Sequence, residues 1–167
     1  MIVCGIDPGL NGGIAFLGGE MPSCCRVPVE TYTIAGKKRK YLDLVSVVEM
    51  LQDKKPDIVY IEKQQAMPGQ GVSSTFKTGF GFGLYIGVLV AMGIRYKQVS
   101  PRKWKGDLNV PKEKDLARLR ATQLIPDLAH KWKLKCEDGV AEAALIAYWG
   151  LNCGQSPNGS KTGSEDS

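Results

Sequence analysis

The chain has 167 residues, of which 43% are hydrophobic and 23% charged, and its net charge is +5. This length allows one domain with a buried core, and the composition excludes a disordered or collagen-like chain. Five cysteines without paired spacing argue against a zinc site, so we expect reduced thiols in a reducing compartment. No apolar run is expected to approach membrane-spanning length and no targeting segment precedes the first predicted strand, so we expect no membrane partner.

The positive charge is concentrated in one part of the chain. Between positions 95 and 135, twelve basic residues stand against four acidic ones, which gives this segment +8 and leaves −3 for the remainder. Such asymmetry favours a polyanionic partner, most simply nucleic acid. The alternative is a solvated basic face without a ligand.

The first predicted element is a short apolar strand that runs directly into an acid, Asp7. A Pro8-Gly9 turn follows, and a second strand is expected over 14–17, so the unit is a β-hairpin with a carboxylate at its end. A carboxylate beside a buried strand is costly unless a cation or hydrogen bonds compensate it. The simpler alternative is a side chain that caps the turn.

Periodicity and turn residues predict the later elements. Strands are expected over 26–33, 58–61 and 94–99, helices over 42–51, 74–92, 111–124 and 137–151, and a short helical turn after Ser100. Pro111 suits the first position of its helix, and Ser73-Ser74-Thr75 offers a cap for the 74–92 helix. We expect one domain over 1–153 and a disordered tail over 154–167, which has no apolar residue.

Two further features belong to the predicted 74–92 helix and its surroundings. Gly79, Gly83 and Gly87 are spaced by four and would line one face, open to the sheet, a second subunit or a sugar-phosphate backbone. The aromatic side chains of the later half are expected in the core rather than at a stacking surface: Phe80, Phe82, Tyr85, Trp104 and Trp149.

Four acids form the candidate site. Glu62 ends the predicted 58–61 strand as Asp7 ends the first, while Asp138 and Glu142 are four apart and share one face of the last helix. Four carboxylates without His or Cys partners select hard cations, Mg²⁺ or Mn²⁺. Two such ions suit in-line hydrolysis of a phosphodiester.

These acids stand within motifs that resemble a known family. The motifs are Gly5–Leu10, Tyr60–Lys63, the glycine-rich run Gly79–Gly87, Trp104-Lys105 and Asp138–Ala143. From residue 1 to about 151 the chain is similar to the RuvC-type Holliday junction resolvases of the ribonuclease H-like superfamily. The plant chloroplast branch, with related phage and bacterial forms, is the most similar.

The resemblance implies an α/β fold with a mixed five-stranded sheet flanked by helices. It implies a homodimeric endonuclease that resolves four-way DNA junctions by paired nicks, with two Mg²⁺ per site and Mn²⁺ as a substitute. The implied metal ligands are Asp7, Glu62, Asp138 and Glu142, and Glu137 can exchange roles with Asp138. Lys105 and Lys114 align with lysines near the scissile phosphate, although plain phosphate contacts are the alternative.

Further residues are candidates for DNA binding: Lys37, Lys38, Arg39, Lys40, Gln64, Gln65, Gln70, Lys77, Arg102, Lys103 and Lys112. The basic run from 37 to 40 is predicted to lie in a loop. Gln65 stands where the bacterial relatives carry an aromatic wedge, so Gln64, Gln65, Met67, Gln70 and Phe76 are candidates for opening the junction. The expected location is the bacterial or phage-infected cytoplasm, with an organelle such as the chloroplast as the alternative.

Three other functions remain open on the sequence. A nuclease of the same fold could act on another branched DNA or on an RNA–DNA hybrid. A sugar kinase or actin-like ATPase shares the opening motif but needs two such domains, whereas 167 residues hold one. A catalytically silent junction-binding module is the third, and the intact set of acids argues against it.

Overall fold

The computed structural model describes residues 1–66 and 69–154, so most of the predicted tail lies outside the described residues. The strands are β1 (Val3–Asp7), β2 (Gly13–Leu17), β3 (Ser23–Arg26), β4 (Val29–Ile34), β5 (Lys37–Leu42), β6 (Ile58–Glu62) and β7 (Tyr96–Val99). The α-helices are α1 (Leu44–Lys54), α2 (Val72–Ala91), α3 (Pro101–Asp107), α4 (Lys114–Leu124) and α5 (Asp138–Asn152). Two 3₁₀ segments, Pro126–Trp132 and Lys135–Glu137, join α4 to α5.

Five strands form one sheet in the order β3-β2-β1-β6-β7, which confirms the mixed five-stranded sheet that the resemblance implied. The β3-β2 and β2-β1 pairs are antiparallel, whereas β1-β6 and β6-β7 are parallel. Ile6 of β1 pairs with Ile61 of β6. Because parallel strands end at the same edge of a sheet, this register puts Asp7 and Glu62, the next residues, side by side.

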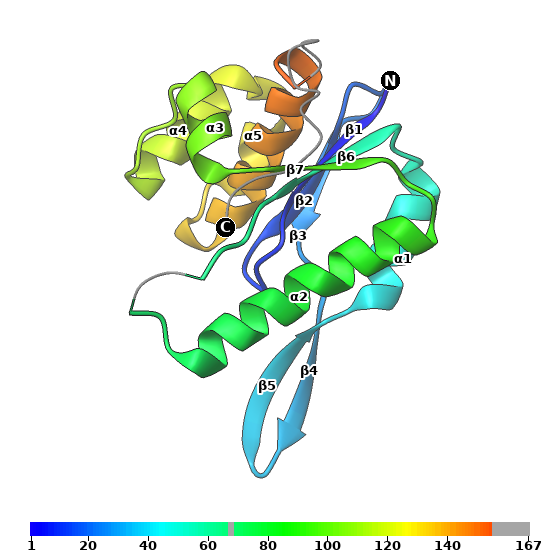
Figure 1. The fold of residues 1–167 in the computed structure, drawn as a ribbon. Coiled ribbons are helices and arrows are strands. Elements are labelled where there is room, and N and C mark those ends of the chain that lie inside the picture. The colour runs from blue at the N-terminus through cyan, green and yellow to red at the C-terminus, as the bar shows by residue number, and fades with distance from the viewer. Residues whose placement is uncertain (67–68, 155–167) are drawn as a thin grey trace, which may run out of the picture.

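Helices cover both faces of the sheet (Figure 1). On one face, α1 and α2 contribute Val47, Leu51, Tyr85 and Leu89 to a core that also contains Ile6. On the other face, α3, α4 and α5 build a second core, whose largest fully buried side chains are Trp104, Trp132 and Tyr60. The strands therefore form a buried central layer, and their near-continuous apolar runs reflect burial on both faces.

Helix α5 lies directly on β1 because glycine leaves room for it. A Cβ atom at Gly5 would come within 2.3 Å of the carbonyl oxygen of Ala143. At the start of α5, a backbone bridge joins Gly139 to Gly12 in the β1-β2 turn. The helix is thus fixed with its first turns beside the end of β1, where Asp7 lies.

The basic run at 37–40 is not a loop, as predicted, but part of strand β5. It pairs with β4 in a two-stranded hairpin that extends away from the main sheet (Figure 1). The two turn residues, Ala35 and Gly36, both have positive φ, which matches the twist of a two-residue hairpin turn. The predicted 26–33 strand is in fact two strands, β3 and β4, separated at Val27-Pro28 because proline cannot donate to a ladder.

Two helix starts also differ from the prediction. Helix α4 begins at Lys114, with Glu113 as its N-cap, so Pro111 lies before the helix and not at its first position. Helix α2 begins at Val72, with Gly71 as N-cap, instead of being capped within residues 73–75. Both starts lie within about three residues of the predicted ones, and helix ends are the part of an element that sequence patterns fix least.

Helix α2 is more exposed and more apolar than expected. By length and composition alone it is able to cross a membrane, so the expectation that no apolar run reaches that length was wrong. Tyr85 and Leu89 pack against the sheet, whereas Val72, Phe76 and Phe80 are largely exposed. Phe80 therefore does not lie in the core as predicted, while Tyr85, Trp104 and Trp149 do.

Candidate active site

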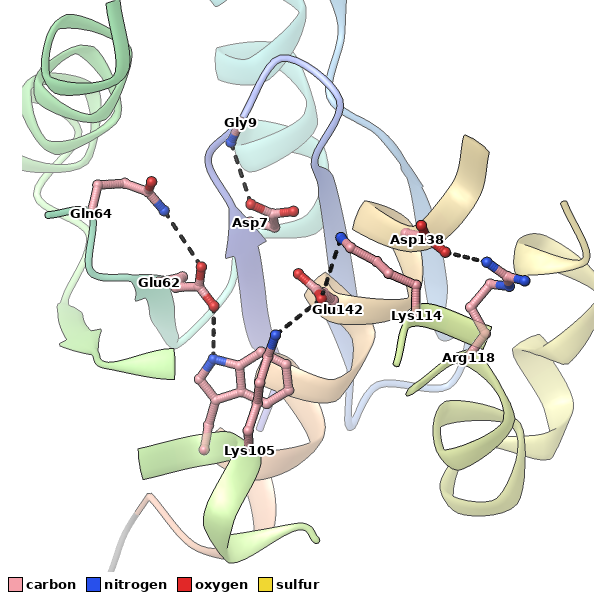
Figure 2. A network of polar contacts seen from close by, with 10 residues as sticks. Asp7, Gly9, Glu62, Gln64, Lys105, Lys114, Arg118, Asp138 and Glu142 are labelled. Carbon is pink, nitrogen blue, oxygen red and sulfur yellow. Dashed lines mark hydrogen bonds and ion pairs between the residues drawn. The ribbon is translucent and has the colours of Figure 1, made fainter. Parts of the chain in front are cut away.

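Three of the four predicted ligands meet at the edge of the sheet where β1 and β6 end. Figure 2 shows Asp7 of β1 above, with Glu62 of β6 on one side below it and Glu142 of α5 on the other. Burial, followed by the charges of Glu62 and Glu142, raises the pKa of Asp7 from 3.8 to about 7. The three carboxylates are therefore close enough to oppose one another's ionisation.

Glu62 is held by two side-chain donors. The indole Nε1 of Trp104 donates to Oε2 at 2.9 Å, and the amide of Gln64 lies 3.5 Å from Oε1. Burial raises the pKa of Glu62, and the hydrogen bond from Trp104 partly offsets this rise by stabilising the charged form.

Glu142 is buried within α5 and is paired with lysine. Its Oε1 accepts a hydrogen bond from Lys105 Nζ at 3.1 Å and lies 3.8 Å from Lys114 Nζ. The residue is 8% exposed, and these ammonium groups compensate the burial of its carboxylate. Both lysines predicted beside the scissile phosphate thus reach the acidic cluster (Figure 2).

Asp138, the fourth predicted ligand, is turned toward a different partner. Its carboxylate binds the guanidinium of Arg118 (Figure 2). The same guanidinium also binds Asp115. Glu137, its proposed substitute, accepts a hydrogen bond from the backbone N–H of Leu134 at 2.8 Å. The structure therefore brings together Asp7, Glu62 and Glu142, but it does not bring Asp138 or Glu137 to them.

The donor set fits a hard divalent cation, although it is not closed around one. Among the described residues, no three acidic, histidine or cysteine side chains lie close enough to hold an ion as they stand. Yet burial and mutual repulsion raise the pKa of both Asp7 and Glu62, and the two lysines beside Glu142 only partly compensate the three carboxylates. Carboxylate oxygens without soft ligands select Mg²⁺ or Mn²⁺.

A groove adjoins this cluster, and we call it the hairpin groove. It has a volume of about 980 Å³ and lies between the β1-β2 turn, strand β5 and the first half of α2. Its lining combines basic, aromatic and small groups: Pro8, Gly9, Leu10, Lys37, Lys38, Arg39, Lys40, Tyr41, Leu42, Gln64, Ser73, Ser74, Phe76, Lys77, Thr78, Phe80, Gly81 and Leu84. The turn residue Gly9 donates to Asp7, so the groove begins at the acids.

The other predicted DNA contacts lie outside the hairpin groove. Lys103 is paired with Asp107, Gln70 contacts Ser74, and the remaining three are exposed or part-exposed: Gln65, Arg102 and Lys112. Met67 lies outside the described residues.

Sequence reasoning missed two residues of the site. Arg118 was counted only as a basic residue, although its spacing of three from Asp115 on α4 signalled an ion pair. Trp104 was assigned to the core, and no spacing indicates that its N–H meets an acid 42 positions away.

The electrostatics of Asp7 predict a pH-dependent stability. Between about pH 4 and 7 the folded state keeps a proton that the unfolded state has released, so the free energy of unfolding falls as pH rises. At about pH 8 without metal, Asp7→Asn should raise the free energy of unfolding by about 2 kcal/mol, because the variant removes a carboxylate that is costly to ionise in the folded state. Mn²⁺ should then stabilise the wild type more than the variant.

Chemical denaturation with chelator and with Mn²⁺ measures both effects. Asp53→Asn is the control, because it makes the same chemical change at an exposed carboxylate on α1. It should change neither the free energy of unfolding in chelator nor the stabilisation by Mn²⁺. An Asp7→Asn protein that is less stable than wild type in chelator would contradict the assigned pKa.

Comparisons with known proteins bear on the fold first. The structure is similar to Thermus thermophilus RuvC in complex with a Holliday junction substrate, with a TM-score of 0.57 and 16% identity over 90% of this chain and 96% of that one. A second structure of Thermus thermophilus RuvC gives 0.55 and 18% identity over the same shares of the two chains. The yeast mitochondrial Holliday junction resolvase Ydc2 gives 0.51 and 15%, covering 87% of this chain and 75% of that one.

One curated relative matches at the level of sequence. The chloroplastic Holliday junction resolvase MOC1 of Chlamydomonas reinhardtii is 32% identical over 94 residues. That match covers 55% of this chain but only 11% of the relative's length. No protein-family model matches the chain. The structural likenesses nevertheless extend over nearly the whole chain, and they show that it has the ribonuclease H-like fold of the RuvC-type resolvases.

Proposed function

We propose that the protein is a structure-selective endonuclease that resolves four-way DNA junctions by paired nicks. The observation that carries this proposal is the cluster of Asp7, Glu62 and Glu142 at the mouth of the basic hairpin groove. The cluster has the chemistry for phosphodiester hydrolysis, and the groove has the charge for a nucleic-acid backbone. The similarity to three junction resolvases, named above, favours a junction over other substrates.

Asp7, Glu62 and Glu142 would hold the metal, which we propose to be Mg²⁺, two ions per site, with Mn²⁺ as a substitute. Bound there, the metal would activate water and stabilise the leaving oxygen. Asp138 would join only if its ion pair with Arg118 opened. Lys105 and Lys114 would compensate the phosphate charge once the metal takes over their contacts with Glu142.

The DNA backbone would lie along the hairpin groove. The exposed basic side chains of β5 and Lys77 of α2 supply positive charge on the two sides of the groove. Gln64 lies where the groove meets Glu62. Phe76 and Phe80 are stacked with centroids 6.1 Å apart, and both are exposed toward this space. They offer an aromatic surface for an unpaired base in place of the missing wedge.

We also propose a homodimer, because a four-way junction has approximate two-fold symmetry and needs two nicks. The glycine face of α2 supports it: Cβ atoms added at Gly79, Gly83 or Gly87 would meet nothing within this chain. The place of action, bacterial or phage cytoplasm or an organelle, stays a prediction. So does the absence of a membrane partner, since an exposed apolar α2 suits a second subunit as well as a bilayer.

Removing a proposed ligand should separate cleavage from binding. Asp7→Asn or Glu62→Gln should slow Mg²⁺-dependent cleavage of a four-way junction by roughly 10³-fold, because a Lewis acid contributes several kcal/mol to such a barrier. The junction Kd should stay near that of the wild type, since the groove is intact. Single-turnover cleavage and gel-shift assays measure the two effects.

The matched control is Glu49→Gln, the same chemical change on the exposed side of α1, which should cleave normally. A substrate panel of four-way junction, flap and RNA–DNA hybrid tests the alternative substrates. Preference for the hybrid would replace the junction in this proposal, and loss of binding in both ligand variants would contradict their role in cleavage alone.

The β5 lysines should contribute charge to binding. Lys38→Gln with Lys40→Gln should weaken junction binding and lower the slope of log Kd against log salt by about 1.8, which corresponds to two lost phosphate contacts. Binding isotherms from about 50 to 200 mM salt measure this slope. Lys54→Gln with Lys55→Gln, at the far end of α1, removes the same charge and should leave the slope unchanged. Equal changes of the salt slope in the two double variants would show that the hairpin groove does not bind the DNA backbone.

The proposed dimer should depend on α2. Sedimentation should give twice the 18.2 kDa of one chain for the wild type and one chain for Gly83→Glu, because a charged side chain would enter the interface. Leu116→Glu places the same charge on the exposed side of α4 and should remain dimeric. A monomeric wild type that still makes paired nicks would rule out this interface.

A further inference from the structure

We propose that Trp104 is a positioning residue: its indole N–H fixes the orientation of the Glu62 carboxylate in the metal site. This inference rests on the proposed function, since it concerns how one of the three proposed ligands is held. Trp104 is completely buried, and its Nε1 lies 2.9 Å from Glu62 Oε2.

The backbone explains why the indole reaches this acid. Val99, the last residue of β7, pairs with Glu62, and the N–H of Lys63 donates to the Val99 carbonyl at 2.8 Å. Helix α3 starts two residues later, capped by the Ser100 side chain, and Trp104 lies on its inner face. Strand pairing and helix capping therefore set the position of the indole before any metal is present.

The indole is suited to hold a ligand without competing for the ion. Its N–H donates only, has no lone pair for a metal, and does not ionise in the physiological range. It occupies Oε2, whereas Oε1 has the 3.5 Å contact with Gln64 and is the freer oxygen. Partner groups of this kind orient metal ligands and contribute to affinity although they never touch the metal.

The same side chain also neighbours the lysine that faces Glu142. Lys105 Nζ lies 5.0 Å from the centroid of the Trp104 ring, and it donates to Glu142 at 3.1 Å. The charge of Lys105 also lowers the pKa of Glu62, against the rise caused by burial. One buried ring therefore contacts both an acid of the cluster and the lysine that pairs with another acid of the cluster.

The other two tryptophans provide matched comparisons. Trp132 donates to the Thr122 hydroxyl at 3.0 Å and Trp149 donates to Asp107 at 2.7 Å. All three indoles are buried donors, but only Trp104 among them donates to a proposed ligand. Trp132→Phe removes a similar hydrogen bond far from the acids and is the control for the loss of the N–H itself.

Metal binding without DNA tests the proposal independently of cleavage. Trp104→Phe keeps the ring and loses the N–H, so calorimetry should show Mn²⁺ affinity reduced about tenfold or more. Trp132→Phe should bind Mn²⁺ as the wild type does. In cleavage assays Trp104→Phe should lower kcat with little change in KM for the junction, because DNA contacts are intact. Equal Mn²⁺ affinity in Trp104→Phe and wild type would overturn the proposal.

A second measurement uses the wild type and does not depend on the folding of a variant. In ¹H–¹⁵N spectra the three tryptophans give three indole signals, and a Mg²⁺ titration should move that of Trp104 while those of Trp132 and Trp149 stay fixed. A fixed Trp104 signal in a protein that binds Mg²⁺ would overturn the positioning role and leave the nuclease proposal standing. A wild type that neither binds a divalent ion nor cleaves any substrate of the panel would overturn both.

Discussion

The repulsion among three part-buried carboxylates is the constraint on which the arrangement of this protein depends. Parallel pairing of β1 with β6 puts Asp7 beside Glu62, and the glycine contact between β1 and α5 brings Glu142 to the same place. These acids do not stabilise one another, since the charges of Glu62 and Glu142 both raise the pKa of Asp7. The fold therefore contributes stability from its two apolar cores to keep an unfavourable cluster in place. Such a local conflict between stability and arrangement is typical of functional sites.

The protein's own cations and hydrogen-bond donors offset part of this repulsion. Lys105 and Lys114 approach Glu142, the Trp104 indole donates to Glu62, and the Gly9 backbone donates to Asp7. Each acid thus has its own compensating group, and these groups differ in how readily a metal ion would displace them. A lysine on a flexible stem leaves easily, whereas a buried indole does not. A divalent ion would consequently displace the lysines from Glu142 and leave the contact between Trp104 and Glu62 in place.

The sequence predicted most of this fold because local and long-range signals agreed. Strands β1 and β6 are short apolar runs that end in acids, and the parallel sheet makes their ends neighbours, so Asp7 and Glu62 could be paired from the sequence. Glu142 was recognisable as an acid inside an apolar helix. The partner of Asp138 could not be predicted. Its spacing from Glu142 places both acids on one helix face, but Arg118, twenty positions away, binds the Asp138 carboxylate. Likewise, β5 was missed because four consecutive basic residues hide the strand pattern, and only pairing with β4 reveals it.

The spatial separation of charge explains how an acidic site can act on a polyanion. The acids lie at the end of the sheet, whereas the basic residues of β5 and α2 line the walls of the adjoining hairpin groove. Phosphates along the groove would gain attraction from these walls, and the one phosphate at the acids would meet repulsion unless cations are present. Several basic residues of the 95–135 segment, which first suggested a polyanion, are instead paired within the protein, including Lys103 with Asp107 and Arg118 with Asp138. Because those charges are already neutralised, the positive surface that would face DNA is smaller than the sequence suggested, and it is set largely by the β4-β5 hairpin, which sequence patterns failed to identify.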